Sequence, residues 1–129
     1  MSKEPITVHH GDPISKVREI FLQNDIHHLP VVSGEKLLGI ISWTDLMRMS
    51  FGDTFDQSDK AVDTTLDHTF TIEDLMEPNP RTLPIDYSIR DAAEALSEAD
   101  FHALPITKGN KLVGIVTTKD LIRFLVSLY

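Results

Sequence analysis

A chain of 129 residues can bury one hydrophobic core, but it is too short to form two independent domains of ordinary size. Because it has no cysteine, a disulfide framework and a thiolate metal site are both excluded. A formal net charge of -8 disfavours nucleic acid as the main partner, since phosphate contacts depend on clustered Lys and Arg.

The N-terminal stretch MSKEPITVHH has no basic head followed by an apolar run, so it does not resemble a secretion signal. No uninterrupted apolar run approaches the roughly 18 residues that a membrane-spanning helix needs. We therefore expect a soluble, cytoplasmic protein with neither a membrane nor a nucleic acid as its partner.

Residues 1–50 predict the order strand, helix, strand, strand, helix. A short extended segment, ITV, precedes a helix that we expect to open at Asp12, with Pro13 as its first residue. Three apolar residues then keep the spacing of an amphipathic helix: Ile14, Val17 and Phe21. The runs LPVV and LLGII, joined by the turn SGEK, predict two strands, and Thr44 would cap the closing helix DLMRM.

Residues 51–70 are rich in Asp and Thr and predict an exposed acidic loop that connects two similar parts. In the segment TIEDLM that follows, Thr71 and Asp74 would cap one helical turn.

The rest of the chain predicts the same order of elements again. The extended segment RTLPI leads to a helix opened by Ser88 and Asp91 as a capping box. The apolar positions expected on its buried face are Ile89, Ala92, Ala93 and Leu96. The strands LPIT and LVGIV, joined by the turn KGNK, precede a last helix, DLIRFLVSLY, that Thr117 and Thr118 can cap.

An internal repeat accounts for this similarity. Shifting the chain by 75 positions (120 minus 45) aligns residues 6–48 with residues 81–123 without a gap, with 15 identities over the 43 positions. The run DIHHLPVVSGEKLLGIISWTDLMR lies over DFHALPITKGNKLVGIVTTKDLIR, and Asp45 lies over Asp120. Two copies of one supersecondary unit explain a register that is kept through turns, strands and helices together.

The repeated pattern resembles tandem cystathionine-β-synthase (CBS) domains, the pair often called a Bateman module. The likeness is carried by DLMEPNPRTL, SIRDAAEAL, HALPIT and GIVTTKDLI, with EPITV, HHLPVV and GIISWTDLM as their counterparts, and it covers nearly the whole chain. It implies an α+β (mixed α/β) fold of two β-α-β-β-α repeats packed about a pseudo-two-fold axis. Repeat one would be residues 1–50 and repeat two residues 71–129, with a lead-in helical turn.

The resemblance also implies two ligand-binding clefts, each built from both repeats. Cleft one would combine Thr82, Phe101, His102 and Ala103 with Ser42, Thr44 and Asp45. Cleft two would combine Thr7, Ile26, His27 and His28 with Thr117, Lys119 and Asp120.

The residue types at the two strand ends suit a nucleoside. A carboxylate at a helix start can accept two hydrogen bonds from the vicinal diol of a ribose. The first backbone N–H groups of the same helix, with the hydroxyls of Ser42 and Thr44, favour an anion. An adenine would lie among apolar strand residues, where Gly39 and Gly114 would let the backbone approach closely. The implied ligands are AMP, ADP, ATP or an S-adenosylmethionine-type compound, with no required cofactor.

Structural alternatives stand beside this interpretation. Asp45 and Asp120 begin helices, where an acid is favourable for stability alone. Single histidines such as His102 are more often ordinary strand-edge residues. A zinc site from His9, His10, His27 and His28 is disfavoured, because their spacing does not define a tetrahedral set. Trp43 can belong to the core, to an interface or to a cleft wall.

The two clefts should differ in the phosphate that they accept. Cleft two has the cation of Lys119 and the side chain of His28, where cleft one has Thr44 and Ala103. We therefore expect cleft two to tolerate more phosphate. Cleft one would suit a mononucleotide or an uncharged adenosyl compound, although Arg81 beside Thr82 adds charge there.

Three functions follow in order of preference. The first is a regulatory module that senses an adenosyl ligand and modulates an unidentified partner protein. The second is a ligand-free assembly module, since the run LIRFLVSLY offers an apolar face that a homodimer or the chain's own core would bury. An enzyme is disfavoured, because the sequence has neither a phosphate-cradling glycine loop nor a recognisable catalytic set, and we predict no catalytic or metal-ligating residues.

Overall fold

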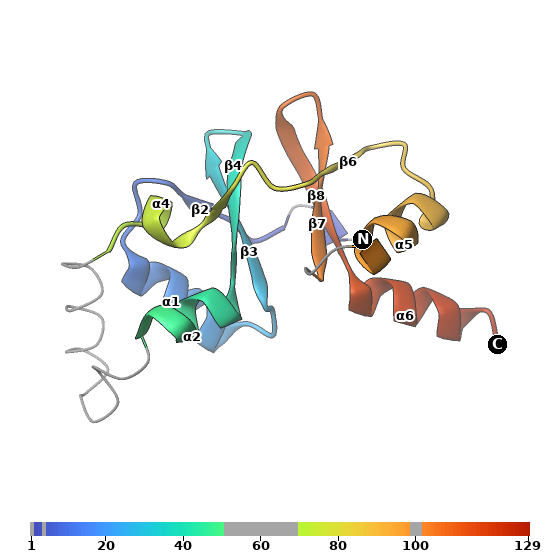
Figure 1. Ribbon diagram of the computed structural model, residues 1–129, viewed down its shortest axis with the longest axis horizontal. Helices are drawn as coiled ribbons and strands as arrows, with labels where there is room; N and C mark the ends of the chain where they lie inside the picture. The colour runs from blue at the N-terminus through green and yellow to red at the C-terminus, as the bar shows by residue number, and fades with distance from the viewer. Residues whose placement is uncertain (1, 4, 51–69, 99–101) are drawn as a thin grey trace. The chain divides into compact units, whose positions relative to one another are not determined.

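The computed structural model describes residues 2–3, 5–50, 70–98 and 102–129 (Figure 1). The predicted acidic loop, apart from Phe70, and Phe101 of cleft one lie outside these residues. The chain divides into two compact units. The first-repeat unit spans Ile6–Gly34 and Leu38–Asn79, and the second-repeat unit spans Met1–Pro5, Glu35–Leu37 and Pro80–Tyr129.

The first-repeat unit is organised around a hairpin with two helices beside it. Its elements are β2 (Val8–His9), α1 (Ile14–Gln23), β3 (His28–Ser33), β4 (Lys36–Ser42, from Leu38 on), α2 (Trp43–Ser50), α4 (Ile72–Leu75) and β5 (Glu77–Pro78). Strand β2 runs parallel to β3, with Val8 opposite Val31. Among the described residues of this unit, the core cluster contains the buried side chains of Val8, Ile14, Val17, Phe21, Leu29, Val31, Ile41, Leu46, Ile72 and Leu75.

The second-repeat unit has the same order of elements. They are β1 (Ser2–Lys3), β6 (Leu83–Pro84), α5 (Ile89–Glu98), β7 (Ala103–Lys108), β8 (Lys111–Thr117) and α6 (Thr118–Ser127). Strand β6 runs parallel to β7, and β7 pairs with β8 in a long antiparallel hairpin. Its core cluster is smaller: Leu83, Ala92, Ala95, Leu96, Leu104, Ile106 and Val116. The predicted order strand, helix, strand, strand, helix is thus confirmed in both repeats.

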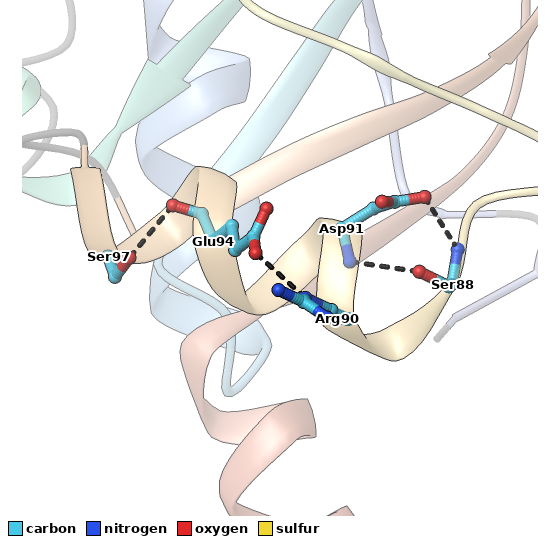
Figure 2. A network of polar contacts seen from close by, with 5 residues as sticks. All are labelled: Ser88, Arg90, Asp91, Glu94 and Ser97. Atoms are coloured by element: carbon cyan, nitrogen blue, oxygen red, sulfur yellow. Dashed lines mark hydrogen bonds and ion pairs between the residues drawn. The ribbon is translucent and has the colours of Figure 1, made fainter.

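Capping boxes open several helices, as the sequence predicts. At α5 the backbone N–H of Asp91 donates to the Ser88 hydroxyl (3.0 Å), and the Ser88 N–H donates to the Asp91 carboxylate (3.1 Å), as Figure 2 shows. Thr71 and Asp74 make the same box at α4. Because each box closes within four consecutive residues, local sequence is enough to specify it.

Two predicted helix starts are corrected. Helix α2 is capped by Ser42, whose hydroxyl accepts from the Asp45 N–H at 3.0 Å, and not by Thr44, which lies inside the helix. Helix α1 begins at Ile14, because Pro13 is extended (ψ 154°) and is therefore the N-cap. The Asp12 carboxylate instead accepts from the His9 N–H at 2.9 Å and pairs with Lys16.

The buried faces of the first helices are confirmed for one repeat and partly wrong for the other. Ile14, Val17 and Phe21 of α1 are buried, as predicted. In α5 the buried residues are Ala92, Ala95 and Leu96, whereas Ile89 is 43% exposed and Ala93 is also exposed. The face that meets β7 is therefore turned away from Ile89 toward the last turns of the helix.

Both hairpin turns need glycine. Gly34 and Gly109 have φ values of 61° and 62°, in the left-handed region where a side chain is unfavourable. The turns SGEK and KGNK thus lie where the sequence predicts them.

Two short strands, β1 and β5 (Glu77–Pro78), were not predicted from the sequence. Strand β5, which leads into repeat two, pairs antiparallel with β4 of repeat one, with Glu77 opposite Ile40. Strand β1, which leads into repeat one, pairs antiparallel with β8 of repeat two, with Ser2 opposite Ile115. The two pairings are related by the same shift of 75 (77 minus 2, and 115 minus 40). Each repeat therefore contributes its leading strand to the hairpin of the other repeat.

Helix α6 leaves its apolar side chains exposed, and none of its residues is buried. The exposed ones are Ile122, Phe124, Leu125 and Val126, followed by Leu128 and Tyr129. Within the described residues, no helix combines the length and the apolarity that crossing a bilayer requires.

Candidate functional site

A polar segment follows the last strand of each hairpin. We call residues 42–45 the Ser42 knot and residues 117–120 the Thr117 knot. In the Thr117 knot the Asp120 N–H donates to the Thr117 hydroxyl (3.2 Å), and the Thr117 N–H donates to Asp120 Oδ2 (2.9 Å). In the Ser42 knot the Ser42 N–H donates to Asp45 Oδ2 at 3.2 Å, which completes the corresponding box.

Capping uses only part of each carboxylate. Both acids accept the backbone N–H through Oδ2, while Oδ1 of Asp45 lies 3.9 Å from the Arg48 guanidinium. The Asp45 side chain is 33% exposed, so it can still be reached by a ligand. An ionised carboxylate has about four acceptor sites, and capping occupies one of them. The stabilising role that the sequence offered as an alternative is real, and it leaves acceptors for a second role.

Each knot is hydrogen-bonded to the His-x-Leu-Pro segment of its own repeat, residues 27–30 or 102–105. The Trp43 N–H donates to the His27 carbonyl oxygen at 2.9 Å, and the Thr118 N–H donates to the His102 carbonyl oxygen at 2.9 Å. The Thr118 hydroxyl adds a bond to the same oxygen at 3.3 Å. The approach to the strand and the polar knot are therefore held side by side in both units.

Strands β5 and β1 pair directly with β4 and β8, the strands that precede the Ser42 knot and the Thr117 knot. Glu77 of β5 is opposite Ile40, two residues before Ser42. A β-carbon on Gly39 would lie 2.6 Å from Met76 Sδ and 2.7 Å from the Glu77 carbonyl oxygen, so β5 packs tightly on Gly39. These residues of the second repeat were missed as neighbours of the Ser42 knot. The signal for them was the register of Met1 with Met76, which extends the repeat upstream of both predicted first strands.

The residues predicted for cleft one lie in different units. Ser42, Thr44 and Asp45 belong to the first-repeat unit, whereas Thr82, His102 and Ala103 belong to the second. Thr82 and His102 are exposed and Ala103 is buried. The joining of these residues into one cleft stays a prediction.

The residues predicted for cleft two divide in the opposite way. The first-repeat unit contains half-buried Thr7, Ile26 and His28 and exposed His27. The second-repeat unit contains Thr117, Lys119 and Asp120, of which only Lys119 is exposed. This cleft also stays a prediction.

The histidine pair near the N-terminus makes structural contacts. The rings of His9 and His10 lie 4.4 Å apart, and His10 Nδ1 is 3.5 Å from Glu73 Oε1 of α4. Across the part of the chain that the structure describes, no group of three or more His, Asp or Glu side chains is arranged to hold a metal ion.

Trp43 contributes to the core of its unit. It is half-buried, and its ring meets Phe21 of α1 edge to face, with centroids 5.7 Å apart. This contact ties the start of α2 to α1.

Tyr87 interacts electrostatically with Asp120 of the Thr117 knot. Its side chain packs against the core of the second-repeat unit. Burial raises the pKa of Tyr87 above its ordinary value of 10.0, and the negative charge of Asp120 raises this pKa further. The titration of Tyr87 therefore reports on its interaction with Asp120.

We expect Asp120→Asn to lower the pKa of Tyr87 without returning it to 10.0, because burial is the larger cause. The neutral phenol contributes stability that is fully present below the unfolded pKa and is lost as the pH rises through the folded pKa. Tyrosinate absorbance against pH, in a Tyr129→Phe background, measures the shift. Asp91→Asn is the control and should leave the titration unchanged; an unchanged titration in Asp120→Asn would show that the two groups do not interact.

The family model for the CBS domain matches residues 1–52 and 72–127, so the chain belongs to the CBS domain family, as a tandem pair. A solved CBS domain pair in complex with 5'-methylthioadenosine and S-adenosyl-L-methionine is 29% identical, with a TM-score of 0.78 over 100% of this chain and 94% of that one. CBSX2 from Arabidopsis thaliana shares the fold, with a TM-score of 0.82 at 24% identity over 99% of this chain and 92% of that one.

Relatives also include parts of larger proteins. L-aspartate semialdehyde sulfurtransferase of Methanocaldococcus jannaschii is 30% identical over 95% of this chain, which spans 22% of that protein. The chain spans less than a third of the length of the first curated relatives that it matches, between 22% and 31%. The similarity to these proteins is thus a similarity to their CBS portions.

Proposed function

We propose that the protein is a regulatory module that binds an adenine nucleotide or adenosyl compound at its two knots and passes the bound state to a partner protein. The observation that carries the proposal is the pairing of β5, from the second repeat, with β4 of the first repeat. Backbone groups of β5 lie against Gly39 and Ile40, immediately before the Ser42 knot, so residues of both repeats meet there inside one compact unit.

The chemistry of the knots supports an adenosyl ligand. The free acceptor sites of Asp45 and Asp120 suit a ribose diol, and the hydroxyls and N–H groups at the same helix starts suit an anion. The related CBS pair at 29% identity binds 5'-methylthioadenosine and S-adenosyl-L-methionine. We propose the same class of ligand here, in clefts that join the residues predicted from the sequence.

Thermal denaturation tests this proposal. A ligand that binds only the folded chain at about 100 times its Kd stabilises it by about 2.7 kcal/mol. We expect at least one of AMP, ADP, ATP, 5'-methylthioadenosine and S-adenosylmethionine to raise the midpoint and to be recovered unchanged after incubation. If none of these compounds raises the midpoint of thermal denaturation, ligand sensing is contradicted. If a product forms during incubation, the non-catalytic role is contradicted.

Lys119→Ala tests the predicted difference between the clefts. Lys119 is exposed at the Thr117 knot, and its aligned counterpart is the uncharged Thr44. Removing the cation should weaken the binding of ATP and ADP more than that of AMP or adenosine, by about fivefold at most for one exposed charge. Calorimetric titration with this series measures the preference, and Thr44→Ala is the matched control. An unchanged order of affinities would end the assignment.

Assembly is the second candidate, and the exposed apolar residues of α6 favour it. Ile122 is 57% and Val126 67% exposed, which is unusual for neighbouring apolar side chains of one helix. We propose that a second copy covers them in a homodimer. Analytical ultracentrifugation of Val126→Glu against the unchanged protein distinguishes a dimer from a monomer.

A further inference from the structure

Three lysines form a row across the hairpin tip of the second-repeat unit. Lys108 of β7 is directly opposite Lys111 of β8, and Lys111 is directly opposite Lys36 at the start of β4. Residues that are directly opposite in a sheet project on the same face. All three side chains are exposed. We call Lys36, Lys108 and Lys111 the lysine row.

The register places the backbones of Lys36 and Lys111 as close together as a sheet allows. The Leu37 N–H donates to the Asn110 carbonyl oxygen (3.1 Å), and the Leu112 N–H donates to the Glu35 carbonyl oxygen (3.0 Å). These bonds flank Lys36 and Lys111, which are therefore a non-hydrogen-bonded pair, the type with the closer side chains.

Like charges in this position oppose folding. Lysines directly opposite each other destabilise a strand pair. One carboxylate, Glu35 Oε1, lies 3.4 Å from Lys111 Nζ, so the tip carries a net charge of +2 (three lysines minus one glutamate). The whole chain has only 12 Lys and Arg against 20 Asp and Glu. A fold that concentrates its scarce cations where they repel each other indicates selection for something other than stability.

We propose that the lysine row is the docking surface for an extended acidic segment of the partner protein. The inference rests on the part of the proposed function that gives the module a partner, and it does not depend on which adenosyl ligand binds.

The dimensions of the row suit such a segment. Neighbouring strands are about 4.8 Å apart, so the row spans about 10 Å between its outer strands. An extended peptide presents side chains on one face about every 7 Å, so that two of its carboxylates fit over the row. The long lysine stems adjust to the remaining difference. Nucleic acid is the less suitable polyanion, because the net charge of -8 would repel a long phosphate backbone.

Fluorescence anisotropy with a labelled oligoglutamate peptide tests the proposal. We expect binding that weakens as the ionic strength rises from about 0.05 to about 0.2 M. Replacing all three lysines of the row by glutamine should weaken peptide binding about tenfold, since each exposed ion pair makes only a small contribution to the affinity. The matched control removes three exposed cations elsewhere: Lys16→Gln, Arg90→Gln and Arg123→Gln. This control has the same net charge and should bind within about twofold of the unchanged protein.

Two further variants separate docking from folding. Lys36→Gln removes the closest repulsion, so we expect a higher thermal midpoint together with weaker peptide binding. Glu35→Gln removes the competing carboxylate, so we expect tighter peptide binding. A lysine row with a purely structural role would not change peptide affinity in either variant.

Three results would overturn the proposal: no binding of oligoglutamate, equal loss in the row variant and the control, or tighter binding of an oligothymidylate through the same lysines. The adenosyl-ligand thermal shift is measured on the same samples. If the proposed sensing is wrong, the shift is missing in every sample, including the unchanged protein. If only the docking proposal is wrong, the thermal shift is kept, and replacing the lysine row changes peptide binding no more than the control does.

Discussion

Replacing Gly39 by alanine should lower the free energy of unfolding by about 3 kcal/mol, the upper part of the range for overpacking a tight contact. The added β-carbon would meet Met76 Sδ at 2.6 Å and the Glu77 carbonyl oxygen at 2.7 Å. The sulfur sits on a flexible side chain, but the carbonyl oxygen belongs to β5 and moves only if the strand moves. Chemical denaturation measures the loss.

Gly11→Ala is the matched control, because a β-carbon there would meet nothing closer than His9 Nδ1 at 3.5 Å. Its effect should stay within about 0.5 kcal/mol. Met76 packs against the core, so Met76→Ala has a cost of its own, but that cost should be smaller beside Ala at position 39 than beside Gly39, since the substitution removes the clashing sulfur and not the carbonyl oxygen. Equal stability of Gly39→Ala and Gly11→Ala would contradict the close packing of β5 on β4.

The same substitution also tests the proposed site. If backbone groups of β5 help to bind the ligand, Gly39→Ala should abolish the stabilisation by ligand at the Ser42 knot even at temperatures where the variant is folded. The Thr117 knot lies on the other hairpin and should keep its response.

Asp45→Asn should weaken adenosyl-ligand binding at its knot by about 1.5 to 3 kcal/mol, the usual contribution of hydrogen bonds to a charged group. This corresponds to about a 10- to 100-fold rise in Kd. Asp120→Asn should do the same at the other knot. Calorimetric titration at a pH near 7 gives both affinities.

Asp91→Asn separates ligand binding from capping. Asp91 makes the same box with Ser88 that Asp45 makes with Ser42, but it opens α5 and belongs to neither knot (Figure 2). All three variants should lose a similar amount of stability, about 1 kcal/mol. Only the knot variants should lose ligand affinity. If Asp91→Asn weakens binding equally, the carboxylates of the knots act as helix caps and not as ribose ligands.

Local chemistry was readable from the sequence. The boxes at Thr71 and Ser88, the cap at Thr117, the two glycine turns and the order of elements in each repeat were predicted correctly. Thr118, which was also expected to cap the last helix, instead lies inside α6 as its first residue. Each of these features depends on residues no more than a few positions apart, so the chain specifies them without help from distant segments. The repeat likewise made the CBS pair identifiable, because register is a property of sequence alone.

Only the tertiary structure decided which distant segments meet. Strands β1 and β5 have two residues each, too few to show any alternation, and their pairing depends on partners 111 to 113 and 37 to 39 positions away. The lysine row arises in the same way, because the repulsion between Lys36 and Lys111 exists only once these two residues are paired within the second-repeat unit. The choice of Ala95 over Ile89 for the core of α5 was settled by the direction in which that helix packs on β7. Long-range pairing and packing are set by the burial of whole surfaces, which short sequence patterns do not encode.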